Sequence, residues 1–114
     1  MKKNFYALGR MKAGKRNGTE TEYEKYLEQL KHDGSIIWHK FEGIKLRLAD
    51  NTFYSPDFVV LNKDYQIEIH EVKGYWTDDA KVKIKVASDL YPFLFKAIYK
   101  IPKKNGGGWR EEIF

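Results

Sequence analysis

The chain has 114 residues, of which 42% are hydrophobic and 16% aromatic, as expected for one folded domain with a single core. It contains no cysteine, so a disulfide scaffold and thiolate zinc sites are excluded and a cytoplasmic location is expected. The sequence has no run of about eighteen apolar residues and no apolar segment after its basic start, so we expect neither a membrane-spanning helix nor a secretory signal.

Positive charge is concentrated at the N-terminus. The net charge of +5 comes from 21 basic and 16 acidic residues, and residues 1–16 hold six of the basic ones and none of the acidic ones. We therefore divide the chain into a basic arm, residues 1–18, and a single domain, residues 19–114. The arm fits contact with the phosphates of a nucleic acid, and a solvated tail is an equal alternative.

A helix is predicted directly after the arm. Thr19 to Glu22 fits a capping box, in which the Thr hydroxyl and the Glu carboxylate bond free amides of the first turn. Apolar residues follow at helical spacing, namely Tyr23, Tyr26, Leu27 and Leu30. The pair Asp33-Gly34 then ends the helix.

From Ile36 onward the apolar period changes to two, which predicts strands. Residues 36–41, 44–48, 52–61 and 65–73 alternate or are rich in β-branched and aromatic residues, and turn residues separate them. Pro56 interrupts the third segment and marks an edge or bulge position. We expect these strands to form an antiparallel meander.

The last third of the chain predicts a helix followed by strands. Residues 78–90 form the helix, with Thr77 as its cap, although Lys81 to Val86 alternates like a strand. Pro92 stops it, residues 93–99 form an apolar strand, and residues 109–114 form a short edge strand after a glycine-rich loop. The predicted order is αβββαβ with extra strands.

Three charged residues stand out in the strand region. Glu71 and Lys73 share one face of their strand with Ile67 and Ile69, at the end of an apolar row where charge is costly. A turn at residues 62–64 folds the strand that carries Asp57 alongside, so the two carboxylates should meet. A divalent cation, Mg²⁺ above all, relieves their repulsion.

These segments resemble the signature of the PD-(D/E)XK nuclease superfamily, which includes restriction endonucleases, Holliday-junction resolvases and small phage endonucleases. Ser55-Pro56-Asp57-Phe58 and Glu71-Val72-Lys73-Gly74 carry the motif. Phage-encoded endonuclease-like proteins are similar over about residues 17–112, through Thr19 to Tyr23, Leu46 to Asp50 and Val72 to Trp76. The resemblance implies the α/β (α+β) class, a restriction-endonuclease-like core and a central mixed sheet flanked by helices.

The resemblance also implies a role for each matched residue. Asp57 and Glu71 would bind the metal with the main-chain carbonyl of Val72, and Lys73 would be the catalytic lysine. Glu20 on the first helix is a further catalytic and metal-binding candidate. The alternatives are a turn-forming Asp57, an exposed pair of Glu71 with Lys73, and a Glu20 that only favours the helix dipole.

Further residues are candidates for contact with DNA, namely Lys12, Lys15, Arg16, Lys83 and Trp76. The lysines and arginine would contact phosphates, and Trp76 would stack on unpaired bases, although packing is the commoner use of such a residue. The three histidines lack metal-ligand spacing, and we predict that they are not catalytic.

The predicted function is a Mg²⁺-dependent endonuclease, with Mn²⁺ as a substitute, that hydrolyses DNA phosphodiester bonds. Branched or structured DNA is the expected substrate, in the context of phage recombination, replication or packaging. The resemblance to resolvases implies a homodimer, and a phage-encoded protein would act in the host cytoplasm. The alternatives are an inactive nucleic-acid-binding module on a nuclease-like fold, and a structural or host-interaction protein in which the motif is accidental.

Overall fold

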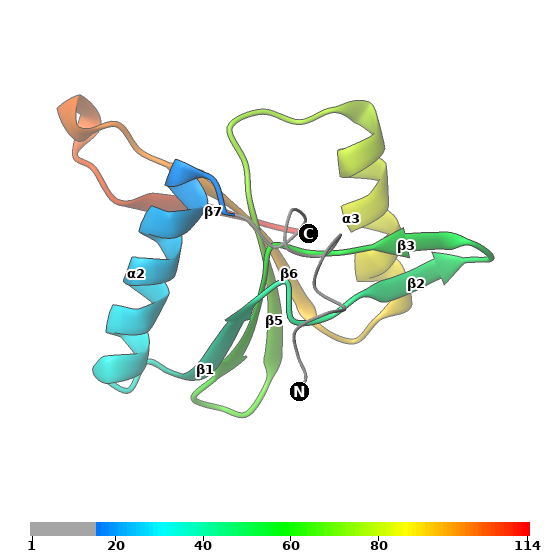
Figure 1. Cartoon of the computed structure of the whole chain (residues 1–114), viewed down its shortest axis with the longest axis horizontal. Helices are drawn as coiled ribbons and strands as arrows, with labels where there is room; N and C mark the ends of the chain where they lie inside the picture. Colours follow the sequence, from blue (N-terminus) through cyan, green and yellow to red (C-terminus); the bar gives the residue numbers. More distant parts are fainter. Residues whose placement is uncertain (1–15) are drawn as a thin grey trace, which may run out of the picture.

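A five-stranded mixed sheet organises the chain in the computed structural model, which describes residues 16–114 (Figure 1). The sheet has the order β1-β4-β5-β6-β7. Its strands are β1 (Ile36–Phe41), β4 (Phe58–Asn62), β5 (Ile67–Val72), β6 (Leu94–Lys100) and β7 (Trp109–Ile113). Only β5 and β6 pair in parallel, and the other neighbours are antiparallel. The fold is therefore α+β, as predicted at this level.

Two helices cover opposite faces of the sheet (Figure 1). α2 (Gly18–His32) packs Tyr23 and Leu27 against Phe58 and Val60 of β4. α3 (Asp78–Leu90) packs Ile84 and Ala87 against residues of β4, β5 and β6 that face the other way, namely Val59, Ile69 and Phe95. The alternation of side chains along β4 and β5 thus builds two hydrophobic layers, one under each helix.

The starts of the two helices show how local sequence sets their bounds. α3 begins after Thr77, whose hydroxyl accepts a hydrogen bond from Ala80 N at 3.2 Å, as predicted. The capping box predicted for Thr19 and Glu22 is wrong. Asn17 is the cap of α2, and it exchanges hydrogen bonds with Glu20 at 2.8 and 3.0 Å. Asparagine caps a helix at least as well as threonine, and Glu20 is the residue three positions later that completes the box.

The predicted meander is also wrong in its middle. β2 (Leu46–Ala49) and β3 (Thr52–Tyr54) form a separate two-stranded sheet, and β1 pairs directly with β4. The hairpin leaves the main sheet because Leu46 and Tyr54 pack under α3 instead. Pro56 lies buried between β3 and β4, where the chain passes from one sheet to the other, and so it is neither an edge nor a bulge residue.

The C-terminal part of the chain follows the prediction. β6 and β7 are antiparallel, and β7 is an edge strand of the sheet. A short 3-10 helix, η1 (Lys103–Asn105), lies between them, and Gly106, Gly107 and Gly108 turn the chain with positive φ values. No helix in residues 16–114 has the length and apolar character to cross a membrane.

Candidate functional site

Asp57 and Glu71 meet where β4 begins and β5 ends. β4 and β5 are antiparallel with Phe58 opposite His70, so the residue before β4 lies beside Glu71. The Asp57 N–H lies 3.3 Å from Glu71 Oε1 and donates to it, and the Val72 N–H donates to Asp57 Oδ2 at 2.8 Å. The hairpin thus brings the two predicted carboxylates together, and backbone amides hold each of them.

The pKa of Asp57 reflects this crowding. Burial and the neighbouring Glu71 carboxylate raise the pKa of Asp57 to about 8, against the opposing hydrogen bond from the Val72 amide. Glu20 raises it further, through its charge and through a hydrogen bond. A carboxylic acid that stays neutral near neutral pH marks a place where negative charge lacks compensation, which is typical of functional sites.

Lys73 supplies the positive charge nearest to this pair. Its Nζ lies 3.1 Å from Glu71 Oε2 and 5.3 Å from the centre of the Trp76 ring. The Glu71 side chain is only 9% exposed and that of Lys73 21%, so the alternative of an exposed surface pair is wrong. Ile69 shares the face of Glu71 and is buried as predicted, whereas Ile67 is 38% exposed and lies outside the core.

Tyr54 is a member of this cluster that sequence analysis missed. Its hydroxyl donates a hydrogen bond to Glu71 Oε1 at 2.7 Å from the end of β3, and the side chain is buried. Burial and the Glu71 carboxylate raise the pKa of Tyr54, so the hydroxyl remains a donor. The available signal was a tyrosine three residues before Asp57, because a buried tyrosine usually needs a partner for its hydroxyl.

Glu20 reaches the same place from α2. It lines a hollow of about 300 Å³ that we call the acidic hollow, whose walls are Asn17, Glu20, Asp57, Val72, Lys73, Gly74, Tyr75 and Thr77. Its carboxylate also accepts the Asn17 N–H, so Glu20 serves the helix cap and the hollow together. Tyr75, at this wall, is 80% exposed, and it is the aromatic residue that sequence analysis passed over in favour of Trp76.

The donor set of the acidic hollow fits a divalent cation held by few protein ligands. Within residues 16–114, no group of three or more His, Asp or Glu side chains is arranged to hold a metal, so Glu20 does not complete a triad. Asp57 and Glu71 supply two carboxylates, and Mg²⁺ commonly takes one or two together with waters and substrate phosphates. Val72 lines the hollow, and the part of its carbonyl in binding stays a prediction.

The predicted DNA-contact residues do not gather at one place. Lys12 and Lys15 lie outside the described residues. Arg16 pairs with Glu24 at 2.6 Å and lies over the Phe41 ring. Lys83 lines a different hollow on the far side of Glu71, next to Tyr54.

Trp76 and the histidines have packing roles in the structure. The Trp76 ring packs on Phe114, and its Nε1–H donates to the Tyr99 hydroxyl at 2.6 Å, which leaves it poorly placed to stack on bases. His70 is buried on the α2 face, where it bonds to the Tyr23 hydroxyl and to Glu68. That His70 takes no part in chemistry stays a prediction, and its place on the opposite face of β5 from Glu71 agrees with it.

No family model matches the chain, and neither the curated proteins nor the solved structures contain a significant match. The site must therefore be interpreted from its own geometry.

Proposed function

We propose that the chain is a metal-dependent nuclease of the PD-(D/E)XK type that hydrolyses DNA phosphodiester bonds. The observation that carries the proposal is the pair of crowded carboxylates, Asp57 and Glu71, with Lys73 3.1 Å from the second of them. Each residue stands at the position that the superfamily motif assigns to it, and the pKa of Asp57 is raised by burial and by Glu71.

The arrangement of the elements supports the same proposal. When the β2–β3 hairpin is set aside, the order is α2, β1, β4, β5, α3 and β6, which is the αβββαβ order of the superfamily core. The carboxylates lie at the start of β4 and the end of β5, the two central strands that would carry the motif, and α3 leads from β5 into the parallel strand β6.

The side chains divide the chemistry between them. A bound Mg²⁺ would polarise the phosphoryl oxygen and lower the pKa of a bound water. Asp57 and Glu71 would hold the cation, which also neutralises their mutual repulsion. Tyr54 keeps Glu71 in place, since its hydroxyl and the Asp57 amide bond one carboxylate oxygen while the other oxygen faces Lys73. Lys73 would orient the attacking water and stabilise negative charge on the phosphate in the transition state.

Branched or otherwise structured DNA is the substrate that suits so small a domain. A protein of 114 residues offers little surface for reading bases, so contacts to phosphates and to DNA shape should dominate binding. The six basic residues of positions 1–16 would add to these contacts. A homodimer, which the resemblance implies, would place two sites on one branched substrate.

Cleavage of a substrate panel tests the proposal. Purified protein should be incubated with linear duplex, single-stranded, flap and four-way-junction DNA, each with Mg²⁺, with Mn²⁺ and with EDTA. We expect cleavage with either metal, fastest on a branched substrate, and none in EDTA. Full activity in EDTA would contradict the proposed chemistry. Tight binding of every substrate without turnover in either metal would favour the inactive binding module.

A further inference from the structure

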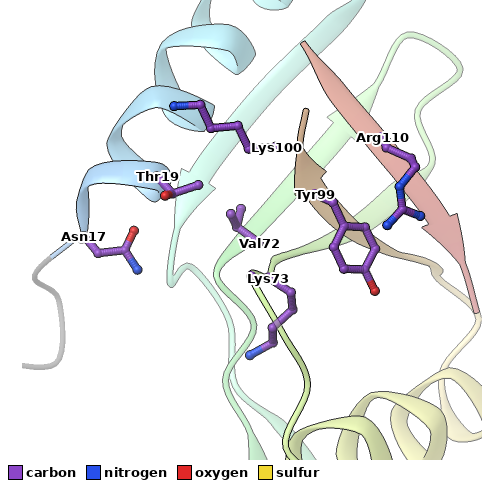
Figure 2. Close-up of a pocket in the computed structure, with 8 residues that line it drawn as sticks. Asn17, Thr19, Val72, Lys73, Tyr99, Lys100 and Arg110 are labelled. Carbon is purple, nitrogen blue, oxygen red and sulfur yellow. The ribbon is translucent and has the colours of Figure 1, made fainter. Parts of the chain in front are cut away.

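A second hollow, which we call the basic hollow, adjoins the acidic one. Its volume is about 340 Å³, and Figure 2 shows side chains from α2, β5, β6 and β7 around it. Its walls are Asn17, Thr19, Val72, Lys73, Gly74, Tyr99, Lys100 and Arg110. Half of these residues also line the acidic hollow, namely Asn17, Val72, Lys73 and Gly74. The two hollows therefore share one wall, which contains Lys73.

The charge of the lining changes sign across this wall. The acidic hollow contains the carboxylates of Glu20 and Asp57. The basic hollow is lined by Lys73, Lys100 and Arg110 and by no carboxylate. A nucleic-acid strand needs both environments, because the scissile phosphate must lie near a metal while its neighbours require positive charge.

Arg110 is positioned for an anion. Its guanidinium carbon lies 4.1 Å from the centre of the Tyr99 ring, and no carboxylate of the described residues forms an ion pair with it. The ring itself is held, because the Tyr99 hydroxyl donates to Glu112 and accepts from Trp76, both at 2.6 Å. A guanidinium stacked in this way keeps its N–H edge for a phosphate.

Lys100 is held in reserve by Glu22. The two side chains form an ion pair at 2.5 Å, and both are about half exposed, at 46% and 52%. An exposed pair of this kind contributes little to stability, so a phosphate can replace Glu22 as the partner of Lys100 at small cost. Figure 2 shows the Lys100 side chain extending toward α2, along the edge of the hollow.

We infer that the basic hollow binds a backbone phosphate of the substrate strand, next to the phosphate that is cleaved. Lys100 and Arg110 are the residues that hold it, and the Thr19 and Asn17 side chains add polar contacts. The inference rests on the proposed function, because it takes the acidic hollow as the place of cleavage. It assigns a positioning role to two residues at the ends of β6 and β7, outside the motif.

The salt dependence of binding tests this assignment without any need for turnover. The affinity for a fluorescent single-stranded oligonucleotide is measured in Ca²⁺ across a range of salt concentrations. The variant is Lys100→Gln with Arg110→Gln, and the matched control is Lys63→Gln with Lys104→Gln, which removes two exposed charges elsewhere. Two lost phosphate contacts should lower the slope of log affinity against log salt by about 1.4, and the control should leave it near the wild-type value.

Two further arms sharpen the result. Glu22→Gln frees Lys100 and should tighten binding severalfold, the opposite of the double variant, so a loss caused by misfolding is recognised. Inorganic phosphate should displace the oligonucleotide only weakly, because one phosphate contacts one of the two hollows. Equal slopes for the double variant and its control, or no binding by the wild type, would overturn the inference. So would efficient displacement by inorganic phosphate, which would identify a site for the free anion.

The outcome also separates this inference from the proposed function. A protein that binds with the expected change in slope but never cleaves in Mg²⁺ or Mn²⁺ retains the phosphate subsite and loses the nuclease assignment. A protein that cleaves while the double variant keeps the wild-type slope retains the nuclease assignment and loses the subsite.

Discussion

Tyr54 holds Glu71 through a hydrogen bond of 2.7 Å from its hydroxyl to Oε1. The bond joins the small β2–β3 sheet to the main sheet, so a hairpin that adds nothing to the central strands fixes a carboxylate on one of them. The Asp57 amide donates to the same oxygen at 3.3 Å, while Oε2 faces Lys73. Both oxygens of Glu71 are therefore oriented before any ligand binds.

Tyr54→Phe should lower activity while the fold persists. The change removes one hydrogen bond and leaves the ring in its buried place, so the free energy of unfolding should fall by about 1 kcal/mol. Turnover should fall by about 10- to 100-fold, the usual effect of losing a group that orients a metal-binding residue. Cleavage rates and denaturant unfolding measure the two effects. Tyr65→Phe, at an exposed turn position, is the matched control and should change neither.

The raised pKa of Asp57 predicts how the stability of the metal-free protein varies with pH. The folded protein keeps a proton on Asp57 up to pH about 8, whereas the unfolded chain releases it near pH 4. Between these values the folded state binds more protons, so the free energy of unfolding should fall as pH rises. Unfolding by urea in EDTA at several pH values measures this slope.

Two variants and one ligand isolate the contribution of Asp57. Asp57→Asn should flatten the decline in stability between pH 4 and pH 8 and make the metal-free protein more stable than the wild type at the upper end. Asp64→Asn, in an exposed turn, should keep the wild-type slope. Saturating Mg²⁺ should stabilise the wild type most at high pH, where Asp57 is ionised. An identical pH dependence for the wild type and Asp57→Asn would show that Asp57 ionises normally in the fold.

His70→Ala should destabilise the protein, although His70 is outside the proposed chemistry. The imidazole lies 2.7 Å from the Tyr23 hydroxyl and 2.8 Å from Glu68, so its loss leaves buried polar groups without a partner. The expected cost is about 2 to 3 kcal/mol. The hydrogen bond from His70 also holds the pKa of Glu68 at about 2. Thermal unfolding measures the cost, and His32→Ala, on the exposed end of α2, should cost far less.

Activity of the same variant checks the assignment of faces on β5. At a temperature where His70→Ala remains folded, its turnover per folded molecule should stay near that of the wild type. A loss of turnover comparable to that of Glu71→Ala, without loss of structure, would show that the face of β5 that carries His70 belongs to the active site.

The elements that local signals define were predictable from the sequence. Helix 78–90 was found at those bounds, because Thr77 and Pro92 set its ends through contacts within a few residues. The approach of Asp57 to Glu71 was also predictable, since a short turn joins the strands that carry them. The cap of α2 was displaced because two adjacent segments both fit the pattern and only Asn17 with Glu20 makes the bonds.

The features that were not predictable depend on contacts between distant segments. Alternation in residues 44–54 indicates strands but not their partners, so the separation of β2 and β3 from the main sheet could not be read from it. Tyr54 and Glu71 are 17 positions apart and belong to different sheets. Arg110 and Lys100 join the wall that contains Lys73 only because β6 lies parallel to β5 and β7 follows it.

Turnover of Lys73→Ala in Mg²⁺ on the best substrate of the panel tests the central claim most directly. Loss of the ammonium that faces Glu71 should lower turnover by at least ~10²-fold, while affinity for DNA and binding of Mg²⁺ stay close to wild type. Lys63→Ala, an exposed lysine of the β4–β5 turn, should behave as wild type. Turnover of Lys73→Ala within twofold of wild type, with the protein folded, would contradict the proposed site.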